Sequence, residues 1–326
     1  MTLPPTHGSG LHLIDLDQDL VGQRRFISCW ALLTPGLSFV VDPGPPATGN
    51  RLLAALEALG CTRLDFILLT HIHLDHAGTT AAVLERWPQA RVICHRRARP
   101  HLEDPARLWA GSLAVLGDKA LVYGQPAPVP ATALADDAEA EARGIRVIAT
   151  PGHAAHHVCF LHGDRLFLGE AAGTYATLGR GPDTPEPYLR PATPPAFRLE
   201  VARRSLDTLL ALDPLPTELL FAHHGRHTGD ARALLGAARA QLGLWVDTCR
   251  AVRAAAGPAA VPGPLLDTIA AELVRRDPHY ARGAALPPDI REREREFTRQ
   301  TLRGMLGYLE DLEDPDRTAG TGSDPS

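Results

Sequence analysis

The sequence predicts an α/β (α+β) fold with an α-helical appendage at its C-terminal end. Short apolar runs of strand length alternate with segments of helical period between residues 10 and 228. One of these runs, Leu64–Leu69, leads directly into a cluster of histidines. Beyond Gly229 the sequence changes to long stretches of helix formers with charged exteriors and apolar stripes. We therefore expect a mixed domain over residues 10–228, a helical region over 229–312 and a disordered tail over 313–326.

Strands and helices are expected to alternate in the first half of the chain. Apolar runs predict strands at residues 11–16, 26–33, 38–44 (ending in a turn), 64–69 and 91–95. Helical spacing predicts helices at residues 51–59, ended by Gly60, and 79–87, ended by Pro88. Residues 100–130 are less regular, and a helix at 108–116 flanked by Pro and Gly indicates a surface excursion.

The second half is expected to continue this alternation before it becomes helical. Strands are predicted at 145–150, 158–161 and 219–221, and helices at 196–212, 231–256, 265–276 and 289–312. Between them, residues 173–195 are rich in proline and lack periodicity, and irregular loops of this length are often functional. Tyr175, Tyr188 and Arg190 are the candidates in this loop for touching substrate, and a purely structural role is equally open for each.

Composition excludes several function classes. The formal net charge is −5 and no basic stripe is present, which disfavours nucleic acid as a partner. The five cysteines form no C-x-x-C pair, which indicates buried free thiols in a reducing compartment. The N-terminus lacks a signal-peptide pattern, and no apolar run approaches the roughly 18 residues of a membrane span. We expect a cytoplasmic protein without a membrane partner.

Four potential metal ligands follow the strand at 64–69: His71, His73, Asp75 and His76. Neutral imidazoles and a carboxylate suit zinc, iron or manganese. In extended backbone, residues two apart face the same side, so His71, His73 and Asp75 are expected to face one point. His76 breaks this period and faces elsewhere unless the chain turns, which hints at a second metal. Single histidines are usually solvated loop residues, but four ligands behind a buried strand indicate a metal site.

The segment Thr70-His71-x-His73-x-Asp75-His76 resembles the signature of the metallo-β-lactamase superfamily of metal-dependent hydrolases. The resemblance implies an αββα sandwich with the metals at one edge, between the two sheets. In this family an aspartate often stands at the turn after the third strand and supports the metal loop. Asp42 matches that position, although an ordinary Asp-Pro-Gly turn accounts for it equally well.

The remaining family motifs have counterparts further along the chain. The segment Thr150-Pro-Gly-His153 resembles the second metal motif, which implies that His153 is a ligand. His156 and His157 follow it; one of them could orient a ligand from outside the site, but the preferred expectation is that both only pack or hydrogen-bond. Glu170 stands where the family usually has an aspartate, one methylene shorter, that bridges the two metals. A glutamate at this position could reach both metals, one of them or neither. The strand at 219–221 ends in His223-His224-Gly, and counting from the strand end favours His223 as the ligand over His224.

The resemblance also implies the chemistry. His71, His73 and His153 would hold one divalent metal, and Asp75, His76 and His223 a second, with Glu170 bridging. Zinc is the first expectation, and iron or manganese are alternatives. A metal-bridging hydroxide would attack the substrate, and Asp75 could act catalytically by orienting this nucleophile or passing a proton to the leaving group.

The expected substrate is a small-molecule ester, thioester or lactone. Alternatives are a mononuclear iron enzyme resembling the persulfide dioxygenases and a phosphodiesterase of the same superfamily; a binding protein with a spent site is disfavoured by the complete ligand set. The basic cluster Arg96, Arg97 and Arg99 could hold an anionic substrate, but a solvated surface is favoured. We expect the C-terminal helices either over the sandwich near the metal mouth or at a homodimer contact.

Overall fold

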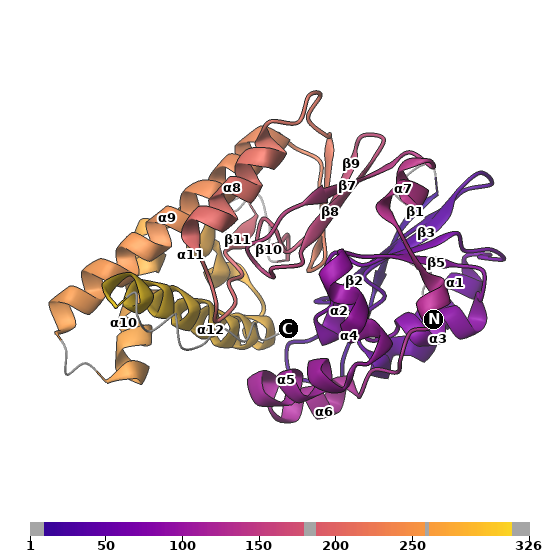
Figure 1. The fold of residues 1–326 in the computed structure, drawn as a ribbon. Coiled ribbons are helices and arrows are strands. Elements are labelled where there is room, and N and C mark those ends of the chain that lie inside the picture. The colour runs from indigo at the N-terminus through magenta and orange to yellow at the C-terminus, as the bar shows by residue number, and fades with distance from the viewer. Residues whose placement is uncertain (1–9, 179–186, 258–260, 315–326) are drawn as a thin grey trace.

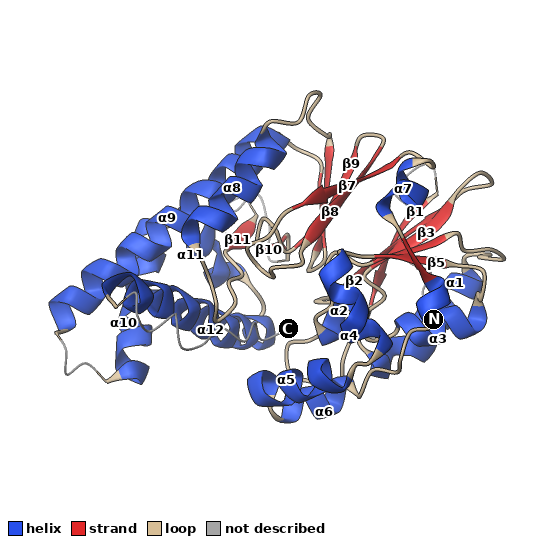
Figure 2. Ribbon diagram, viewed as in Figure 1, coloured by secondary structure: helices blue, strands red, loops and turns tan. Residues whose placement is uncertain are grey.

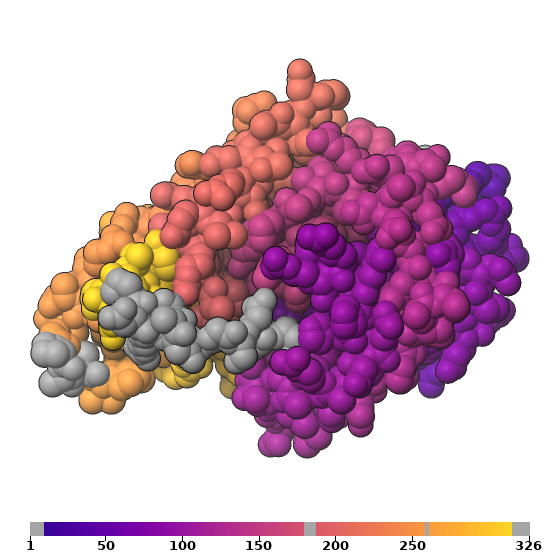
Figure 3. All heavy atoms as spheres, in the orientation of Figure 1, coloured from indigo at the N-terminus to yellow at the C-terminus, as the bar shows by residue number. Residues whose placement is uncertain are grey.

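The computed structural model describes residues 10–178, 187–257 and 261–314. Within these residues, two β-sheets face each other and helices cover their outer sides (Figure 1 and Figure 2). In Figure 3 the surfaces of the indigo-to-magenta first half and of the orange-to-yellow C-terminal region lie side by side. The predicted αββα sandwich with a helical C-terminal region is confirmed.

The first sheet, as far as it is described, has the strand order β1-β2-β3-β4-β5-β6. The pairs β1–β2 and β2–β3 are antiparallel, and the pairs from β3 to β6 are parallel. Parallel neighbours need crossover connections. The connection from β3 to β4 contains α1, and the connection from β4 to β5 contains α3. The bounds are β1 Leu11–Asp15, β2 Ser28–Leu33, β3 Ser38–Val41, β4 Phe66–Leu68, β5 Arg91–Ile93, β6 Leu134–Ala135, α1 Gly49–Ala58 and α3 Thr80–Arg86.

The second sheet has the described strand order β13-β12-β9-β8-β7. The strands β7, β9 and β12 run in the same direction, because β8 is antiparallel to both β7 and β9, and β9 is parallel to β12. The carboxyl ends of these three strands therefore meet at one edge of the sheet. The bounds are β7 Ile145–Ala149, β8 Val158–His162, β9 Arg165–Gly169, β12 Glu218–Phe221, β13 Gly225–His227 and, between β9 and β12, α8 Leu199–Leu210.

Three apolar layers hold the sandwich together. The layer between the sheets contains aromatic side chains from both, such as Trp30 and Phe39 of the first sheet and Phe160 and Phe167 of the second. A second layer lies between the first sheet and α1 and α3, and a third between the second sheet and the helices that follow it. Burial on both faces explains why β4 is a continuous apolar run instead of an alternating one.

The two irregular regions contain more structure than their sequences indicate. Residues 99–123 form α4 Arg99–Glu103, α5 Ala106–Leu116 and α6 Asp118–Tyr123, so the predicted helix at 108–116 is confirmed and two more accompany it. The region 173–195 was expected to lack regular structure, but β10 Thr174–Ala176 pairs with β11 Tyr188–Arg190, and residues 179–186 lie outside the description.

The proposed substrate-contacting side chains of this region are buried. Tyr175 is 1%, Tyr188 2% and Arg190 2% exposed. Tyr175 stacks on Phe221, and both Tyr188 and Arg190 hydrogen-bond Glu294. The structural alternative is therefore the correct one for all three.

The C-terminal helices agree closely with the sequence expectation. The helix α9 spans Ala231–Ala256, α10 Pro262–Arg276, α11 Pro278–Ala281 and α12 Pro288–Glu313. Of the predicted disordered tail at 313–326, Glu313 ends α12 and residues 315–326 lie outside the description.

No helix in the described ranges is both long and apolar enough to cross a membrane. All five cysteines fall in the described ranges, where they are buried and unpaired. The remaining short elements are α2 Leu74–Ala77, α7 Asp137–Glu141, η1 Pro46–Thr48, η2 Arg96–Ala98, η3 Ala131–Ala133 and η4 Arg282–Ala285.

Candidate metal centre

The histidine-rich segment follows β4 and turns sooner than its sequence suggests. The backbone of His73 is still extended, but α2 begins at the next residue, so Asp75 and His76 lie in a helical turn. The expectation that Asp75 continues the extended period is therefore wrong. The same turn brings the ring of His76 to 4.2 Å from the ring of His71, centroid to centroid. Both histidines now face one centre, which the strand period alone did not allow.

Asp42 holds this segment in place. The Asp42 carboxylate is 2% exposed and accepts hydrogen bonds from the Thr70 backbone N–H (2.8 Å) and the Thr70 hydroxyl (2.7 Å). It also lies 3.3 Å from Nδ1 of His76. The backbone of Asp42 has φ of 53°, a conformation that aspartate tolerates better than most residues. The supporting role is confirmed, and a simple turn does not account for Asp42.

These contacts fix which ring nitrogens are free to bind a metal. The Thr70 hydroxyl donates to Asp42, so it accepts from Nδ1 of His71 at 3.0 Å. In the same way Nδ1–H of His76 donates to Asp42. The Nε2 lone pairs of both rings then face the centre, and both Nε2 atoms are buried without a hydrogen-bond partner in the described residues. Buried nitrogens of this kind are costly unless something binds them, and a metal cation fits.

His153 reaches the same centre from the loop after β7. Its Nε2 lies 3.0 Å from Nδ1 of His73, and its Nδ1 lies 3.1 Å from the carbonyl oxygen of Ala192. Burial lowers the pKa of His153, but the Glu170 carboxylate, 2.9 Å away, outweighs burial and raises it. For His71, burial and then the neighbouring His76 lower the pKa well below its usual value, which keeps that imidazole neutral and able to bind a metal.

Glu170 lies between the two groups of histidines. Its Oε2 is 2.9 Å from Nε2 of His153 and 3.4 Å from Nε2 of His76, and its Oε1 is 3.4 Å from Nε2 of His223. Burial would raise the pKa of Glu170, but the facing His153 and His223 outweigh it and hold the pKa well below the usual value. A carboxylate placed between two histidine groups is suited to bridge two cations, so the extra methylene does not move it out of reach. Bridging itself stays a prediction.

Gly169, just before Glu170, allows the close approach of three segments. Its φ is +53°, and a Cβ there would lie 2.5 Å from Nε2 of His157 and 2.6 Å from the hydroxyl of Thr70. Only glycine fits this position without displacing the residues that hold the metal loop.

The structure separates the two histidines that end β12. Nδ1 of His223 lies 3.2 Å from the carbonyl oxygen of Phe26, so the opposite nitrogen, Nε2, points toward Glu170 and lies 3.9 Å from Asp75 Oδ2. His224 has φ of 64° and points away, with its Nε2 accepting a hydrogen bond from Arg293 at 2.5 Å. His223 is therefore the member of the pair that joins the centre, as its position at the strand end indicated.

The predicted ligands gather into two groups. Within each group one potential ligand atom per residue lies within 4.8 Å of the others: His71, His73, His153 and Glu170 in the first, and Asp75, His76 and His223 in the second. A third combination, Asp42 with His71 and His76, is also that close, but Asp42 is already engaged by Thr70. Imidazole and carboxylate donors suit zinc, manganese or iron. The structure thus brings all seven predicted side chains together, and their ligation of metal stays a prediction.

His156 and His157 support the centre from outside it. Nε2 of His157 accepts the backbone N–H of Glu170 at 3.2 Å, and Nε2 of His156 accepts that of Ile72 at 3.2 Å. Burial, and then the neighbouring His95, lower the pKa of His156 to about 4, so this ring stays a neutral acceptor. Both histidines hydrogen-bond, as expected, and the contact of His157 with the backbone of Glu170 also fits the alternative, that one of them orients a ligand. Arg99 of the basic cluster likewise has a structural partner, Asp136, at 2.7 Å.

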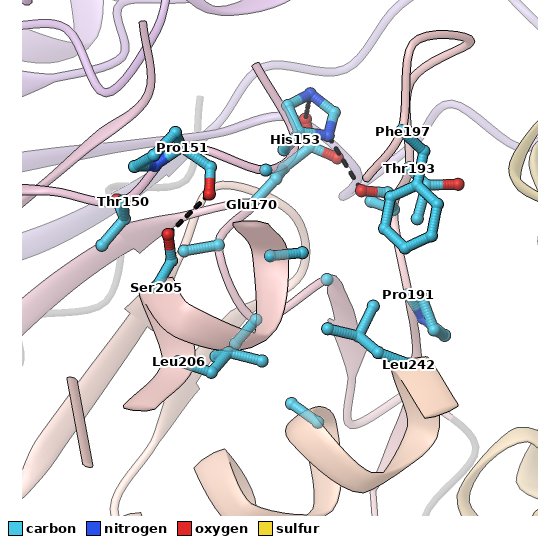
Figure 4. A pocket seen from close by; sticks show the side chains of 17 residues that line it. Thr150, Pro151, His153, Glu170, Pro191, Thr193, Phe197, Ser205, Leu206 and Leu242 are labelled. Atoms are coloured by element: carbon cyan, nitrogen blue, oxygen red, sulfur yellow. Dashed lines mark hydrogen bonds and ion pairs between the residues drawn. The ribbon is translucent and has the colours of Figure 1, made fainter. Parts of the chain in front are cut away.

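A small cavity lies beside the first group. It encloses about 20 Å³, room for little more than one water molecule, and His153 and Glu170 form its polar end. Figure 4 shows the side chains of Leu206 and Leu242, from α8 and α9, on its other side, and the Ser205 hydroxyl donating to the carbonyl oxygen of Pro151. Sequence reasoning missed this cavity, the contact of Phe26 with His223, and the contacts of Arg293 with Phe26 and His224. No local pattern marks them, because their contacts join distant parts of the chain.

Comparisons with known proteins agree with the geometry. The chain matches the family model described as the metallo-beta-lactamase superfamily over residues 22–244. A hydroxyacylglutathione hydrolase of Acidiphilium cryptum is 32% identical over 250 residues, which cover 74% of this chain and 82% of that protein. A metallo-beta-lactamase fold-containing protein of Sulfurisphaera tokodaii is 32% identical over 176 residues, and the match covers 50% of this chain and 61% of that protein.

Two solved structures share this fold over most of the chain or nearly all of it. The crystal structure of the archaeal superfamily protein from Sulfolobus tokodaii has a TM-score of 0.56 at 25% identity and covers 73% of this chain and 86% of its own. A metallo-beta-lactamase family protein of Thermus thermophilus has a TM-score of 0.57 at 21% identity and covers 97% of both chains. The second match shows that the fold likeness includes the C-terminal helical region.

Proposed function

This chain belongs to the metallo-β-lactamase superfamily, and within it we propose a metal-dependent hydrolase that cleaves a small-molecule thioester. Esters and lactones are the neighbouring substrate classes. One observation carries the proposal: two groups of imidazole and carboxylate donors converge on the single carboxylate of Glu170. A binding protein would have no need for this arrangement of donors around a shared carboxylate.

Each group would hold one divalent cation, zinc in the first instance. Bound there, the cations would supply Lewis-acid activation of water and of the substrate carbonyl. The chain's own contribution is the fixed orientation of the donors: Asp42 and Thr70 hold the imidazoles of His71 and His76 with their Nε2 atoms inward. Glu170 places one negative charge between the two groups.

Asp75 is the side chain best placed to move protons. Its side chain is 19% exposed, compared with 11% for His153 and 9% for Glu170. Its Oδ2 lies 3.5 Å from Nε2 of His76 and 3.9 Å from Nε2 of His223. A carboxylate at the accessible side of the centre can accept a proton from the attacking water and deliver it to the departing sulfur. The net reaction consumes one water and releases a carboxylic acid and a thiol.

The thioester is preferred for two reasons. The Acidiphilium cryptum relative is named for the hydrolysis of a hydroxyacylglutathione, whose acyl group is joined through sulfur. The formal net charge of −5 gives no support to a polyanionic substrate such as a nucleic acid.

The test begins with metal analysis of the purified protein, followed by a screen of thioesters, esters, lactones and phosphodiesters. We expect about two equivalents of divalent metal and fastest turnover of a thioester. One iron per chain together with oxygen uptake on a persulfide would instead identify a dioxygenase. Fastest turnover of a phosphodiester would also overturn the thioester proposal.

Replacing His71 by alanine should abolish metal binding to the first group and hydrolysis with it, because only two imidazoles, His73 and His153, would remain beside the Glu170 carboxylate that both groups share. Elemental analysis and a thioesterase assay check this together. His162, the last residue of β8, is a matched control, because its contacts are with the carbonyl oxygen of Gly144 and the ring of Phe39 and not with the candidate centre. His162→Ala should keep both metal and activity, and full metal content in His71→Ala would refute the assignment.

A further inference from the structure

A buried arginine of the C-terminal helical region contacts two residues that adjoin the predicted ligand His223. Arg293 lies in α12 and is only 3% exposed. In Figure 1 the beginning of α12 lies beside the first half of the chain, and the ion pair between Asp289 and Arg24 (2.8 Å) joins them there. The centre of the Arg293 guanidinium stands 4.1 Å from the centroid of the Phe26 ring.

Phe26 connects this arginine to a predicted ligand. The rings of Phe26 and His223 stack with centroids 4.1 Å apart and planes 6° from parallel. The carbonyl oxygen of Phe26 also accepts the hydrogen bond from Nδ1 of His223, at 3.2 Å. Both the plane of the His223 ring and the direction of its Nε2 are therefore set by this one residue.

Arg293 contacts both segments that meet at Phe26 and His223. One guanidinium nitrogen donates to the carbonyl oxygen of Gly22, in the loop that leads to Phe26. Another donates to Nε2 of His224, the residue next to His223, at 2.5 Å. The Phe26 loop and the end of β12 are thus tied to one side chain.

The charge of Arg293 is balanced within the protein interior. Its guanidinium contacts Glu294 at 3.0 Å, and Glu294 also pairs with Arg190 of β11 at 2.6 Å. Burying such a cation is costly, and an ion pair of this kind gains mainly a defined geometry. A planar guanidinium donates in several fixed directions at once, which the single ammonium of a lysine cannot reproduce.

We propose that Arg293 is a positioning residue that orients His223 through Phe26 and His224, so that α12 helps to determine whether the second metal group is occupied. This inference rests on the metal centre of the proposed function. Because His71, His73 and His153 are held by other elements, the loss of Arg293 should loosen the second group and leave the first intact. A residue important only for stability would weaken both groups equally.

The test compares Arg293→Lys with Arg299→Ala, a control on the same helix whose ion pair with Asp267 lies at the surface. Metal-free protein is titrated with zinc and with cobalt(II), whose absorption spectrum reports the geometry of each bound ion. For Arg293→Lys we expect an unchanged first equivalent and a 10- to 100-fold weaker second equivalent, roughly the loss known for residues that orient metal ligands. Arg299→Ala should titrate like the parent.

A second variant keeps the inference testable if Arg293→Lys does not fold. Phe26→Leu retains the backbone carbonyl that His223 needs but removes the stacked ring, and the second equivalent should again weaken selectively. Two equivalents bound as tightly as in the parent by both variants would overturn the inference, as would a parent that binds only one metal. A parent that binds two metals but hydrolyses no substrate would overturn the proposed function alone.

Discussion

Single residues decide which nitrogen each imidazole offers at the candidate centre. Asp42 is not expected to bind metal, yet it fixes the proton positions of His71 and His76, directly or through Thr70. Its contribution can be measured separately from that of the ligands. The same is true of Glu170, whose carboxylate contacts both groups at once.

Asp42→Asn should weaken both metal groups. An amide can accept only through its oxygen, so one of the donors now facing the carboxylate would meet an NH₂ group instead. We expect about a 10- to 100-fold loss of metal affinity and a loss of about 1.5–3 kcal/mol in the free energy of unfolding. Calorimetric metal titration and denaturant unfolding measure the two effects. Unchanged metal affinity would show that Asp42 only forms the turn.

Glu170→Ala should keep the first metal and lose most of the second. The first group retains three histidines, whereas the second loses the carboxylate that faces His76 and His223. Activity should fall with the second metal, because hydrolysis would depend on both cations. Metal titration and a thioesterase assay of the same preparation check this. Two tightly held metals per chain, as in the parent, would show that Glu170 only hydrogen-bonds a histidine ring.

Elements with a strong local signal were predicted closely. The helix at 231–256 has the observed bounds of α9, because Asp230 caps its start by accepting the N–H of Ala233 and Gly257 ends it in a positive-φ conformation. The cluster from His71 to His76 was found from its spacing behind a strand, and His153, Glu170 and His223 were found from the resemblance to the family motifs. The β10–β11 pair was missed, because short strands such as these are stabilised by tertiary contacts and not by periodicity. The link from Arg293 to Phe26 was missed for the same reason: no local pattern specifies a contact between the two ends of the chain.

The stability of the junction between β11 and α12 should depend on pH. Burial would raise the pKa of Glu294, but Arg190 and then Arg293 outweigh it and lower the pKa to about 2. A lowered carboxyl pKa stabilises the fold above the ordinary value near 4.5, and this stabilisation is lost as pH falls from there through about 2. The shift corresponds to about 3 kcal/mol.

Glu294→Gln isolates this effect from that of the histidines. We expect the metal-free variant to be about 3–5 kcal/mol less stable than the parent near neutral pH, because it leaves two buried guanidinium groups unpaired. The difference in the free energy of unfolding between the variant and the parent should be constant above pH 5 and shrink toward pH 3. Denaturant unfolding of both proteins across this range measures it, and a difference independent of pH would contradict the assignment.

At the scale of the whole molecule, the C-terminal helices serve as the outer layer of the second sheet. Leu235, Leu242 and Trp245 of α9 lie in one apolar cluster with Leu166 and Phe221 of the sheet. Leu302 and Met305 of α12 belong to the same cluster. The type of secondary structure therefore changes near residue 229, but the apolar core continues across this position. Placement over the sandwich accounts for the helices without a homodimer contact, which stays a prediction.

Truncation tests this continuity most directly. Removing residues 230–326 would expose the apolar face of the second sheet, where each large side chain contributes about 1.5–3 kcal/mol by burial, so we expect an insoluble or unfolded product. Removing residues 258–326 keeps α9 but deletes α12 with Arg293, and it should lose the second metal at the least. Removing only residues 315–326 is the matched control, because α12 stays complete. Size-exclusion chromatography, thermal unfolding and metal analysis compare the three. A soluble, stable and equally active monomer ending at Gly229 would show that the C-terminal region is a separate appendage.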